Sequence, residues 1–368
     1  MPIQNNTYQT AQRKATTARI LFYGTDGAGK AQPLDSLILT PKGWRRMGAL
    51  EVGDEITSAT GGKTRIVGIY PQGVQPVYRV TFNDGTSVEC TNDHLWHTRT
   101  LSERDHRRQH PGSVRTLREI AETLKDNRGK RQHSIPLVQP VQFDDFGEPP
   151  IDPYLFGVLL GDGHFGARFV RLCNSNPELR ELAIAKLPDG VGAREAKSRP
   201  GTMMLNRVAR SGENPLVTAI RELGLAGHKS VDKFIPNVYL FGTVEARIAL
   251  LQGLLDTDGY AYKTSIEYST SSDQLAKQVR FLVESLGGIV TVRTRTPTYT
   301  HKGEKRVGSL SYRLHLRLPA WLKPFRLSTK QVAYRPRTKY PPNRLIDSVE
   351  LVGDKPVQCI AVDALNRS

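Results

Sequence analysis

The chain has 368 residues and carries 52 Lys and Arg against 36 Asp and Glu, so its formal net charge at pH 7 is +16. This length allows two or three compact domains, and the positive charge favours a polyanion such as nucleic acid over an acidic small substrate. A merely soluble basic protein would share this composition. The three cysteines, Cys90, Cys173 and Cys359, do not suggest a disulfide framework, and we expect Cys90 and Cys173 to be small buried residues. Because no stretch suits a membrane span or a signal peptide, we expect a cytoplasmic protein with no membrane partner.

The first predicted element is a strand that leads into an interrupted phosphate-binding loop. Residues 19–23 read as a buried strand, and residues 24–30 fit the GxxxxGK part of a P-loop. The next residue is Ala31, so the Ser or Thr hydroxyl that would hold Mg²⁺ is missing, and the sequence that follows does not resemble a helix. A degenerate glycine turn is one reading of this segment. The interpretation we favour is a motif that another sequence interrupts, which makes a working P-loop ATPase improbable.

From Ala31 onward the pattern changes to alternating strands and turns, which is typical of an all-β region. Residues 77–82 and 86–90 read as two strands around Asp-Gly, a strong hairpin signal because this pair suits positive φ. Farther along, residues 101–138 are rich in Arg, Lys and His around a short amphipathic helix at 116–124. This basic segment is either a solvated face or a contact for DNA phosphates.

These β-rich segments resemble the Hint splicing domain of inteins. Residues 31–35 together with 50–54 are similar to the first splicing motif, and residues 85–94 are similar to the second, including its TxxH. Most inteins begin with Cys or Ser, whereas this one begins with Ala31, which rules out the usual first acyl shift. The resemblance places the splice junction between Lys30 and Ala31.

A minority class of inteins lacks the first nucleophile and is similar to this chain. It uses a Trp two residues after the TxxH histidine, an internal Cys near the C-terminus, and a Thr in the last motif. Trp96 and Cys359 occupy the first two places. The chain ends at Ser368, before a last motif with its penultimate His and terminal Asn, so we do not expect this chain alone to complete splicing. Truncation, a split element with a separate partner, and gene decay all remain open.

The chemistry of peptide-bond cleavage suits the residues in these places. A thiolate is the best nucleophile that side chains offer near neutral pH, so Cys359 can attack. His94 can protonate the leaving nitrogen, and the Thr91 hydroxyl can hold the strained amide. Trp96 is either core filler or an organiser of the nucleophile. This chemistry requires no cofactor.

A second group of functional residues lies in the central region. Residues 152–163 predict an apolar helix that begins at Asp-Pro and ends at glycine, and residues 243–259 predict a second helix capped by threonine. Each helix ends with a carboxylate, Asp162 and Asp258, where the helix dipole disfavours negative charge unless a cation neutralises it, so the pair suggests a bound metal. Small residues would let the two helices pack closely and bring these carboxylates together: Gly157, Gly161 and Gly253.

Both segments resemble the LAGLIDADG motif of homing endonucleases, and a separation of about a hundred residues suits two similar half-domains. The resemblance extends to residues 232–236, where the family often places a lysine near the scissile phosphate, here Lys233, and to a helix from residue 272 that ends near Gly288. Two carboxylates that hold a divalent metal suit phosphodiester hydrolysis, and Mg²⁺ is the natural ion for an all-oxygen site.

Basic strands follow the second motif. Residues 289–295 and 312–317 alternate so that one face can present arginines to a DNA groove while the other packs. The predicted DNA-binding residues are Arg293, Arg295, Arg313 and Arg317.

We therefore predict a β-rich, horseshoe-like Hint splicing domain plus an α/β LAGLIDADG endonuclease domain with two pseudo-symmetric halves. The expected parts are a host segment at 1–30, the splicing domain at 31–138 and 336–368, without its last motif, and the endonuclease at 139–335. The predicted function is protein splicing combined with site-specific cleavage of double-stranded DNA, the host gene without the intein. The expected form is a monomer within the sequence of a host ATPase. The alternative is a freestanding homing endonuclease with a non-splicing Hint remnant.

Overall fold

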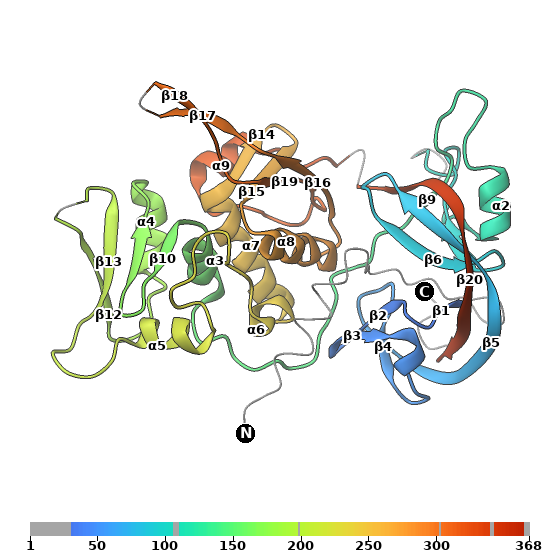
Figure 1. Cartoon of the computed structure of the whole chain (residues 1–368), viewed down its shortest axis with the longest axis horizontal. Helices are drawn as coiled ribbons and strands as arrows, with labels where there is room; N and C mark the ends of the chain where they lie inside the picture. Colours follow the sequence, from blue (N-terminus) through green and yellow to red (C-terminus); the bar gives the residue numbers. More distant parts are fainter. Residues whose placement is uncertain (1–30, 106–109, 198, 302, 339–341, 364–368) are drawn as a thin grey trace. The chain divides into compact units, whose positions relative to one another are not determined.

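The computed structural model describes residues 31–105, 110–197, 199–301, 303–338 and 342–363 (Figure 1). The chain divides into two compact units, the first formed by residues 1–143 with 342–368 and the second by residues 144–341. The P-loop-like segment up to Lys30 and the chain end after residue 363 lie outside the described residues. Among the helices that the structure describes, none is long and apolar enough to cross a membrane.

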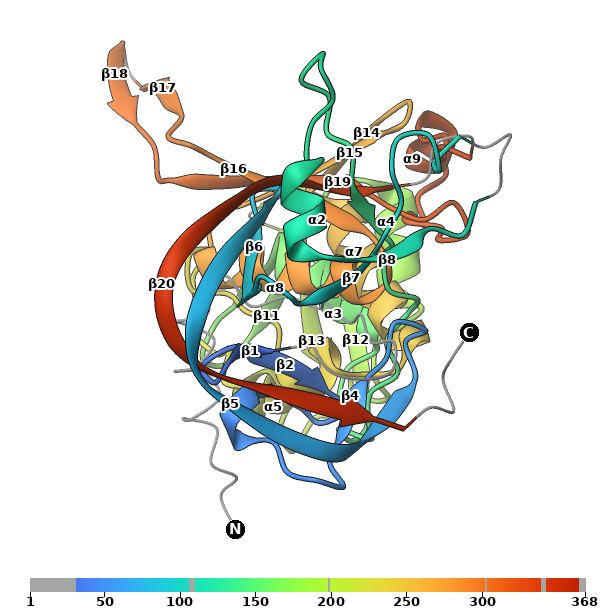
Figure 2. The ribbon, with the colours of Figure 1, turned by 90° about the vertical axis from the view of Figure 1, so that its right-hand side faces the viewer.

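The first unit is built on two long antiparallel strands, β5 (Lys63–Phe82) and β20 (Arg344–Val362). They pair from Ile346 opposite Phe82 to Val362 opposite Ile66, with four register shifts along the way. Such irregularities bend and twist a strand without ending it. The sequence pattern predicts short strands here, whereas the structure has two continuous ones that curve together as one ribbon (Figure 2).

Shorter elements complete this unit. Strands β1 (Gln32–Pro33) and β9 (Ser134–Ile135) pair with β20, and β4 (Glu55–Thr57) and β6 (Ser87–Thr91) pair with β5. Two separate hairpins are formed by β2 (Leu37–Thr40) with β3 (Gly43–Arg46), and by β7 (Leu95–Thr98) with β8 (Ser113–Thr116). The helical elements are the 3-10 turn η1 (Met47–Ala49) and α2 (Leu117–Glu122).

Two local sequence predictions are confirmed in this unit. The Asp-Gly turn joins β5 to β6, and Gly85 has a φ of +79°, in the region that glycine tolerates best. The predicted short helix forms as α2, where Thr116 and Glu119 make a reciprocal capping box. A buried ion pair between Arg344 and Asp84, 2.9 Å apart, fastens the start of β20 to this turn.

The second unit consists of two α/β halves with the same sheet order, β10-β11-β13-β12 and β14-β15-β19-β16. The first half contains α3 (Pro153–Asp162), β10 (Gly163–Phe165), β11 (Val170–Cys173), α4 (Pro177–Ile184), β12 (Val191–Glu195), β13 (Thr202–Arg207) and α5 (Pro215–Glu222). A short α6 (Asn237–Leu240) leads to the second half, which contains α7 (Val244–Asp258), β14 (Gly259–Tyr262), β15 (Ser265–Thr270), α8 (Asp273–Ser285), β16 (Ile289–Arg295), the hairpin β17 (Thr298–His301) and β18 (Glu304–Val307), β19 (Ser311–Arg317) and α9 (Ser328–Ala333). The predicted pseudo-symmetric halves are confirmed.

Helices α3 and α7 lie side by side between the two halves of this unit (Figure 1). Their backbones touch through the predicted glycines. A Cβ added to Gly157 would lie 2.3 Å from the carbonyl oxygen of Leu250, and one added to Gly253 would lie 2.2 Å from that of Tyr154. No side chain fits at either position, so the two helices can approach this closely only with glycine.

Glycine follows the last residue of both helices. The usual reason for glycine at this position, a left-handed backbone conformation, does not apply here. Gly163 and Gly259 have φ values of −82° and −87°, so neither adopts the left-handed conformation. A Cβ at Gly163 would instead lie 2.2 Å from the carbonyl oxygen of Leu159, and one at Gly259 2.3 Å from that of Leu255. Space, rather than backbone conformation, requires glycine at these ends.

One predicted burial is wrong. Cys90 is buried as expected, but Cys173 is exposed. Along β11, Val170 and Leu172 face the core, so strand alternation places Cys173 on the opposite face with Arg171.

Candidate functional site

Asp162 and Asp258 are the last residues of α3 and α7, and the close helix packing brings them together. A Cβ built on Gly161 would lie 3.1 Å from Oδ2 of Asp258. Burial raises the pKa of Asp162, although Asn174 donates a hydrogen bond to its Oδ2 at 2.6 Å. Asp258 remains accessible to solvent, yet the surrounding protein displaces enough water to raise its pKa, and the charge of Asp162 raises it further, to about 6. The two carboxylates therefore form a site where added positive charge would be stabilising.

Lys233 caps the C-terminus of α3. Its Nζ is buried and donates to the carbonyl oxygens of Gly163 and Leu160 at 2.7 and 2.8 Å, with longer contacts to Leu159 and Gly161. Burial lowers the pKa of Lys233 to about 8, against the opposing effect of the two aspartates. The cation that the helix dipole requires at this end is thus partly supplied by a lysine, rather than by a metal alone.

Lys330 does the same for α7, although the sequence pattern did not single it out. Its Nζ donates to the carbonyl oxygens of Gly259, Leu255 and Asp256 at 2.6, 2.7 and 2.7 Å. Burial lowers the pKa of Lys330, while nearby aspartates oppose the shift. The internal repeat could have revealed this residue, because Asp258 follows Asp162 by 96 positions and Lys330 follows Lys233 by 97.

A third carboxylate near this site has a structural role. Asp256 is buried and accepts a hydrogen bond from the Tyr154 hydroxyl at 2.9 Å. It also accepts the backbone N–H groups of Arg326 and Leu327, at 3.0 and 3.3 Å to Oδ2. Asp256 therefore links α3 and α7 to the segment that leads into Lys330.

The four predicted DNA-binding arginines fall on one face of the second-half sheet. Arg293 is opposite Arg313, and Arg295 and Arg317 follow on the same face by strand alternation. The other face packs, with Val290, Leu314 and Leu316 buried.

Glu267 lies on this basic face, which the sequence did not suggest. Its carboxylate is 3.5 Å from Nη1 of Arg313 and 3.4 Å from Nε2 of His315. It is a negative charge among positive ones, so it opposes the binding of a polyanion there.

In the first unit, Cys359 and Ala31 lie together. Gln32 pairs with Gln358 between β1 and β20, so one step further along the antiparallel register Ala31 is opposite Cys359. Both residues are buried in a small cluster with Val77 and Val357. Thr91 contacts the same place, because its backbone N–H and its Oγ1 donate to the carbonyl oxygen of Ala31 at 3.2 and 3.4 Å.

His94 and Trp96 form the neighbouring part of this site. His94 is buried just after β6, and its backbone N–H donates to the carbonyl oxygen of Thr91 at 3.1 Å. Its ring meets the Trp96 ring edge-on, with centroids 5.5 Å apart. Trp96 packs in a different core cluster from Cys359, together with Phe82 and Cys90. The structure thus associates Trp96 with His94 rather than with the cluster that contains Cys359.

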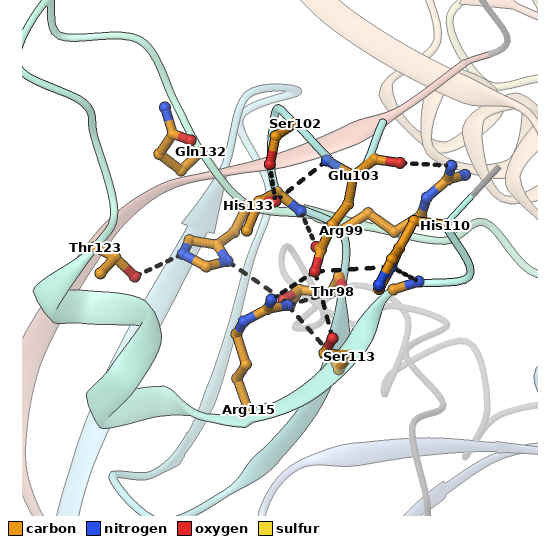
Figure 3. A network of polar contacts seen from close by, with 12 residues as sticks. Thr98, Arg99, Ser102, Glu103, His110, Ser113, Arg115, Thr123, Gln132 and His133 are labelled. Atoms are coloured by element: carbon orange, nitrogen blue, oxygen red, sulfur yellow. Dashed lines mark hydrogen bonds and ion pairs between the residues drawn. The ribbon is translucent and has the colours of Figure 1, made fainter. Parts of the chain in front are cut away.

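Part of the basic segment at 101–138 forms an internal polar network (Figure 3). Arg115 donates to Glu103 at 2.8 Å, and His133 lies between the hydroxyls of Thr98 and Thr123, at 3.3 and 2.9 Å. Burial raises the pKa of Glu103, but hydrogen bonds from the Thr100 backbone and Arg115 outweigh it and lower the pKa to about 2. Arg115 is therefore engaged within the protein.

Comparisons with known proteins find similarity along most of the chain. Residues 245–317 match the family described as a LAGLIDADG-like domain. The replicative DNA helicase DnaB of Mycobacterium intracellulare is 30% identical over 366 residues, which cover 94% of this chain and 58% of that protein. Protein RecA of Mycobacterium tuberculosis is 29% identical over 178 residues, covering 44% of this chain and 22% of RecA. The crystal structure of the Msm DnaB1 intein splicing domain, bound with zinc, is 28% identical, with a TM-score of 0.21, and the match covers 29% of this chain and 67% of that one.

The chain spans less than two thirds of the length of these curated relatives. Its sequence relationship to DnaB nevertheless covers most of the chain, and the LAGLIDADG-like match falls on the second half of a two-fold repeated unit. The chain therefore contains a LAGLIDADG-like domain at residues 245–317, within an α/β unit that is inserted in sequence into a β-rich unit.

Proposed function

We propose that this chain combines protein splicing in its first unit with cleavage of double-stranded DNA in its second. The observation that carries the proposal is the meeting of Asp162 and Asp258 at two helix ends, each end capped by a buried or half-buried lysine. The proposed parts are those expected from sequence, splicing at 31–138 and 336–368 and DNA cleavage at 139–335. The proposed DNA target is the host ATPase gene with an uninterrupted P-loop, and the acting form is a monomer.

The two aspartates are the proposed ligands of a divalent metal, with Mg²⁺ as the natural ion. Their mutual repulsion, which raises the pKa of Asp258, is relieved by a cation between them. Among the described residues no group of three or more His, Cys, Asp or Glu side chains could hold a metal. This fits Mg²⁺, which is often held by one or two carboxylates together with water and substrate phosphate. When bound, the ion supplies an activated water and neutralises charge on the leaving oxygen.

The protein's own residues position the DNA and stabilise developing charge. Lys233 and Lys330 each hold an ammonium group near both aspartates, where its positive charge opposes the rise in their pKa values and can stabilise developing negative charge. The arginine face of the second-half sheet holds the backbone phosphates, with Arg293, Arg295, Arg313 and Arg317 as its contacts. These contacts align the scissile bond with the aspartates.

In the splicing unit, the Cys359 thiolate is proposed to attack the carbonyl carbon of Lys30. The Lys30–Ala31 peptide bond breaks, the segment ending at Lys30 becomes a thioester of Cys359, and His94 delivers a proton to the departing nitrogen of Ala31. Thr91 supports this step because it holds the Ala31 carbonyl. Trp96 orients the His94 ring through its edge contact. No cofactor is needed.

One experiment tests the nuclease function directly. The purified chain is incubated with a plasmid that carries the uninterrupted P-loop gene, with and without Mg²⁺, and linear product is measured. Cleavage at one site only in the presence of the metal supports the proposal, and intact plasmid under all conditions refutes it. The alternative, a homing endonuclease with a non-splicing remnant, predicts cleavage of DNA without any thiol-dependent release of the segment before Ala31.

A further inference from the structure

The backbone that carries Lys233 is held by a helix of the second half. Ser272, the N-cap of α8, donates its hydroxyl to the carbonyl oxygen of Lys233 at 2.7 Å. Two residues after Lys233, Ile235 is held by the Gln278 side chain of α8. The Gln278 amide accepts a hydrogen bond from the Ile235 N–H and donates one to the Ile235 carbonyl oxygen, both at 2.7 Å. All of these groups are buried. Lys233 therefore caps α3 of the first half while its backbone is fixed from the second half.

The backbone that carries Lys330, in the second half, is held in turn by a helix of the first half. Helix α9 begins at Ser328, and its N-cap residue Leu327 has no side chain that caps it. Glu178 of α4 supplies the cap instead, accepting the Ser328 N–H at 2.9 Å and the Ser328 hydroxyl at 2.8 Å. A carboxylate is favourable at a helix N-terminus because the first N–H groups lack partners within the helix. Lys330 therefore caps α7 of the second half while α9 is anchored to the first.

Helices α4 and α8 are equivalent elements of the repeat. Their N-caps, Asn176 and Ser272, are 96 positions apart, the same separation as Asp162 and Asp258. The two anchoring helices consequently follow the pseudo-symmetry of the unit, although Gln278 lies one turn beyond Gln274, the position equivalent to Glu178. Neither half holds its lysine by its own elements alone.

From this crossed arrangement we infer that Glu178 and Gln278 are positioning residues for the lysines of the DNA-cleaving site, each acting across the boundary between the halves. Glu178 places Lys330, and Gln278 places Lys233. The inference rests on the proposed nuclease function and deepens it. Each lysine caps the helix that ends in an aspartate of one half, but its position depends on a residue of the other half.

The first test measures the lysines themselves, without DNA. The whole chain is treated with limiting acetic anhydride, and mass spectrometry gives the acetylation rate at Lys233 and Lys330. Glu178→Ala should raise the rate at Lys330 about fivefold, the effect of losing one net hydrogen bond, and leave Lys233 unchanged. Gln278→Leu should raise the acetylation rate at Lys233 and leave that at Lys330 unchanged. Glu178→Gln, which keeps an acceptor oxygen, should restore most of the protection.

Matched controls lie on the same helices. Glu181→Ala removes an exposed carboxylate from α4, and Gln274→Leu removes an amide one turn before Gln278 on α8. Neither should alter the rate at either lysine. If Glu178→Ala exposes both lysines equally, or neither, its contact with Ser328 is only structural and the inference is overturned. A thermal unfolding scan of each variant shows whether it is folded.

The second test uses cleavage in crossed double variants. Glu178→Ala should lower kcat with little change in DNA affinity, should add nothing further in a Lys330→Met background, and should still add in a Lys233→Met background. Gln278→Leu should add nothing further in the Lys233→Met background and should still add in the Lys330→Met background. Equal additivity in both backgrounds would contradict the crossed assignment. If the wild-type chain cuts no DNA while acetylation still shows the crossed pattern, the nuclease function fails and the positioning of the lysines stands.

Discussion

Cys359 lies directly across the β1–β20 pair from Ala31, although the two residues stand near opposite ends of the described chain. This juxtaposition places a thiol beside Ala31, whose bond to the preceding residue is the proposed splice junction. It motivates the first prediction, which concerns the chemistry at that bond.

Thiol treatment of the whole chain should release the segment that ends at Lys30, and Cys359→Ala should abolish the release because the thioester can no longer form. Intact-mass spectrometry detects the loss of residues 1–30. Cys173→Ala is the matched control, since Cys173 is an exposed thiol in the other unit and its removal should change nothing. Release that persists in Cys359→Ala would exclude Cys359 as the initiating nucleophile.

The carboxylate pair gives the second prediction. Asp162→Asn and Asp258→Asn should each lower the DNA cleavage rate by at least about a hundredfold, because metal ligation supplies several kcal/mol of transition-state stabilisation. Binding of DNA should change far less, since it depends mainly on lysine and arginine contacts. The measurements are plasmid linearisation and a gel-shift titration. Asp232→Asn, the same change at an exposed residue beside Lys233, is the control. Undiminished cutting in either site variant would remove that aspartate from the site.

The pKa of Asp258 gives the third prediction. Displacement of water by the surrounding protein and the charge of Asp162 raise this pKa from 3.8 to about 6, so between these values the folded state holds a proton that the unfolded state releases. Stability contributed by this group therefore declines as pH rises from about 4 to above 6. In EDTA, Asp258→Asn should unfold at higher urea concentration than the wild type at pH 7.5, and the difference should shrink at pH 4.5.

Addition of Mg²⁺ at pH 7.5 should stabilise the wild type more than Asp258→Asn, because the ion binds the folded carboxylate pair. If Asp258→Asn is less stable than the wild type in EDTA at pH 7.5, the surroundings of Asp258 do not disfavour its charged form. Urea titrations followed by circular dichroism provide both comparisons.

Glu267 gives the fourth prediction. Its carboxylate lies between Arg313 and His315 on the basic face, so Glu267→Gln should free both groups for phosphate. We expect DNA to bind about two- to fivefold more tightly at low salt, with a steeper loss of affinity as salt rises. Fluorescence anisotropy at two salt concentrations measures this. Glu222→Gln, at the end of α5, removes a carboxylate of the same kind elsewhere. Weaker binding by Glu267→Gln would mean that DNA does not use this face.

The elements that depend on neighbouring residues could be predicted from the sequence. The Asp-Gly turn before β6, the short helix α2 and the threonine cap of α7 all formed as expected. Such features arise from hydrogen bonds within a few residues, so local sequence contains the information they need. The glycines that let α3 and α7 touch were also recognisable, because glycine is unfavourable inside an apolar helix unless another backbone must approach closely there.

The contacts between distant residues were decided only by the tertiary structure. Lys330 reaches the end of α7, and Glu178 reaches the start of α9, across separations that no local pattern encodes. Cys173 is exposed because its strand partners set which face points inward, and Trp96 packs with a different cluster from Cys359 for the same kind of reason. The sequence by itself determined the types of helix ends, turns and functional groups, whereas folding decided which of those groups meet, because pairing of distant strands and helices depends on the packing of the whole unit.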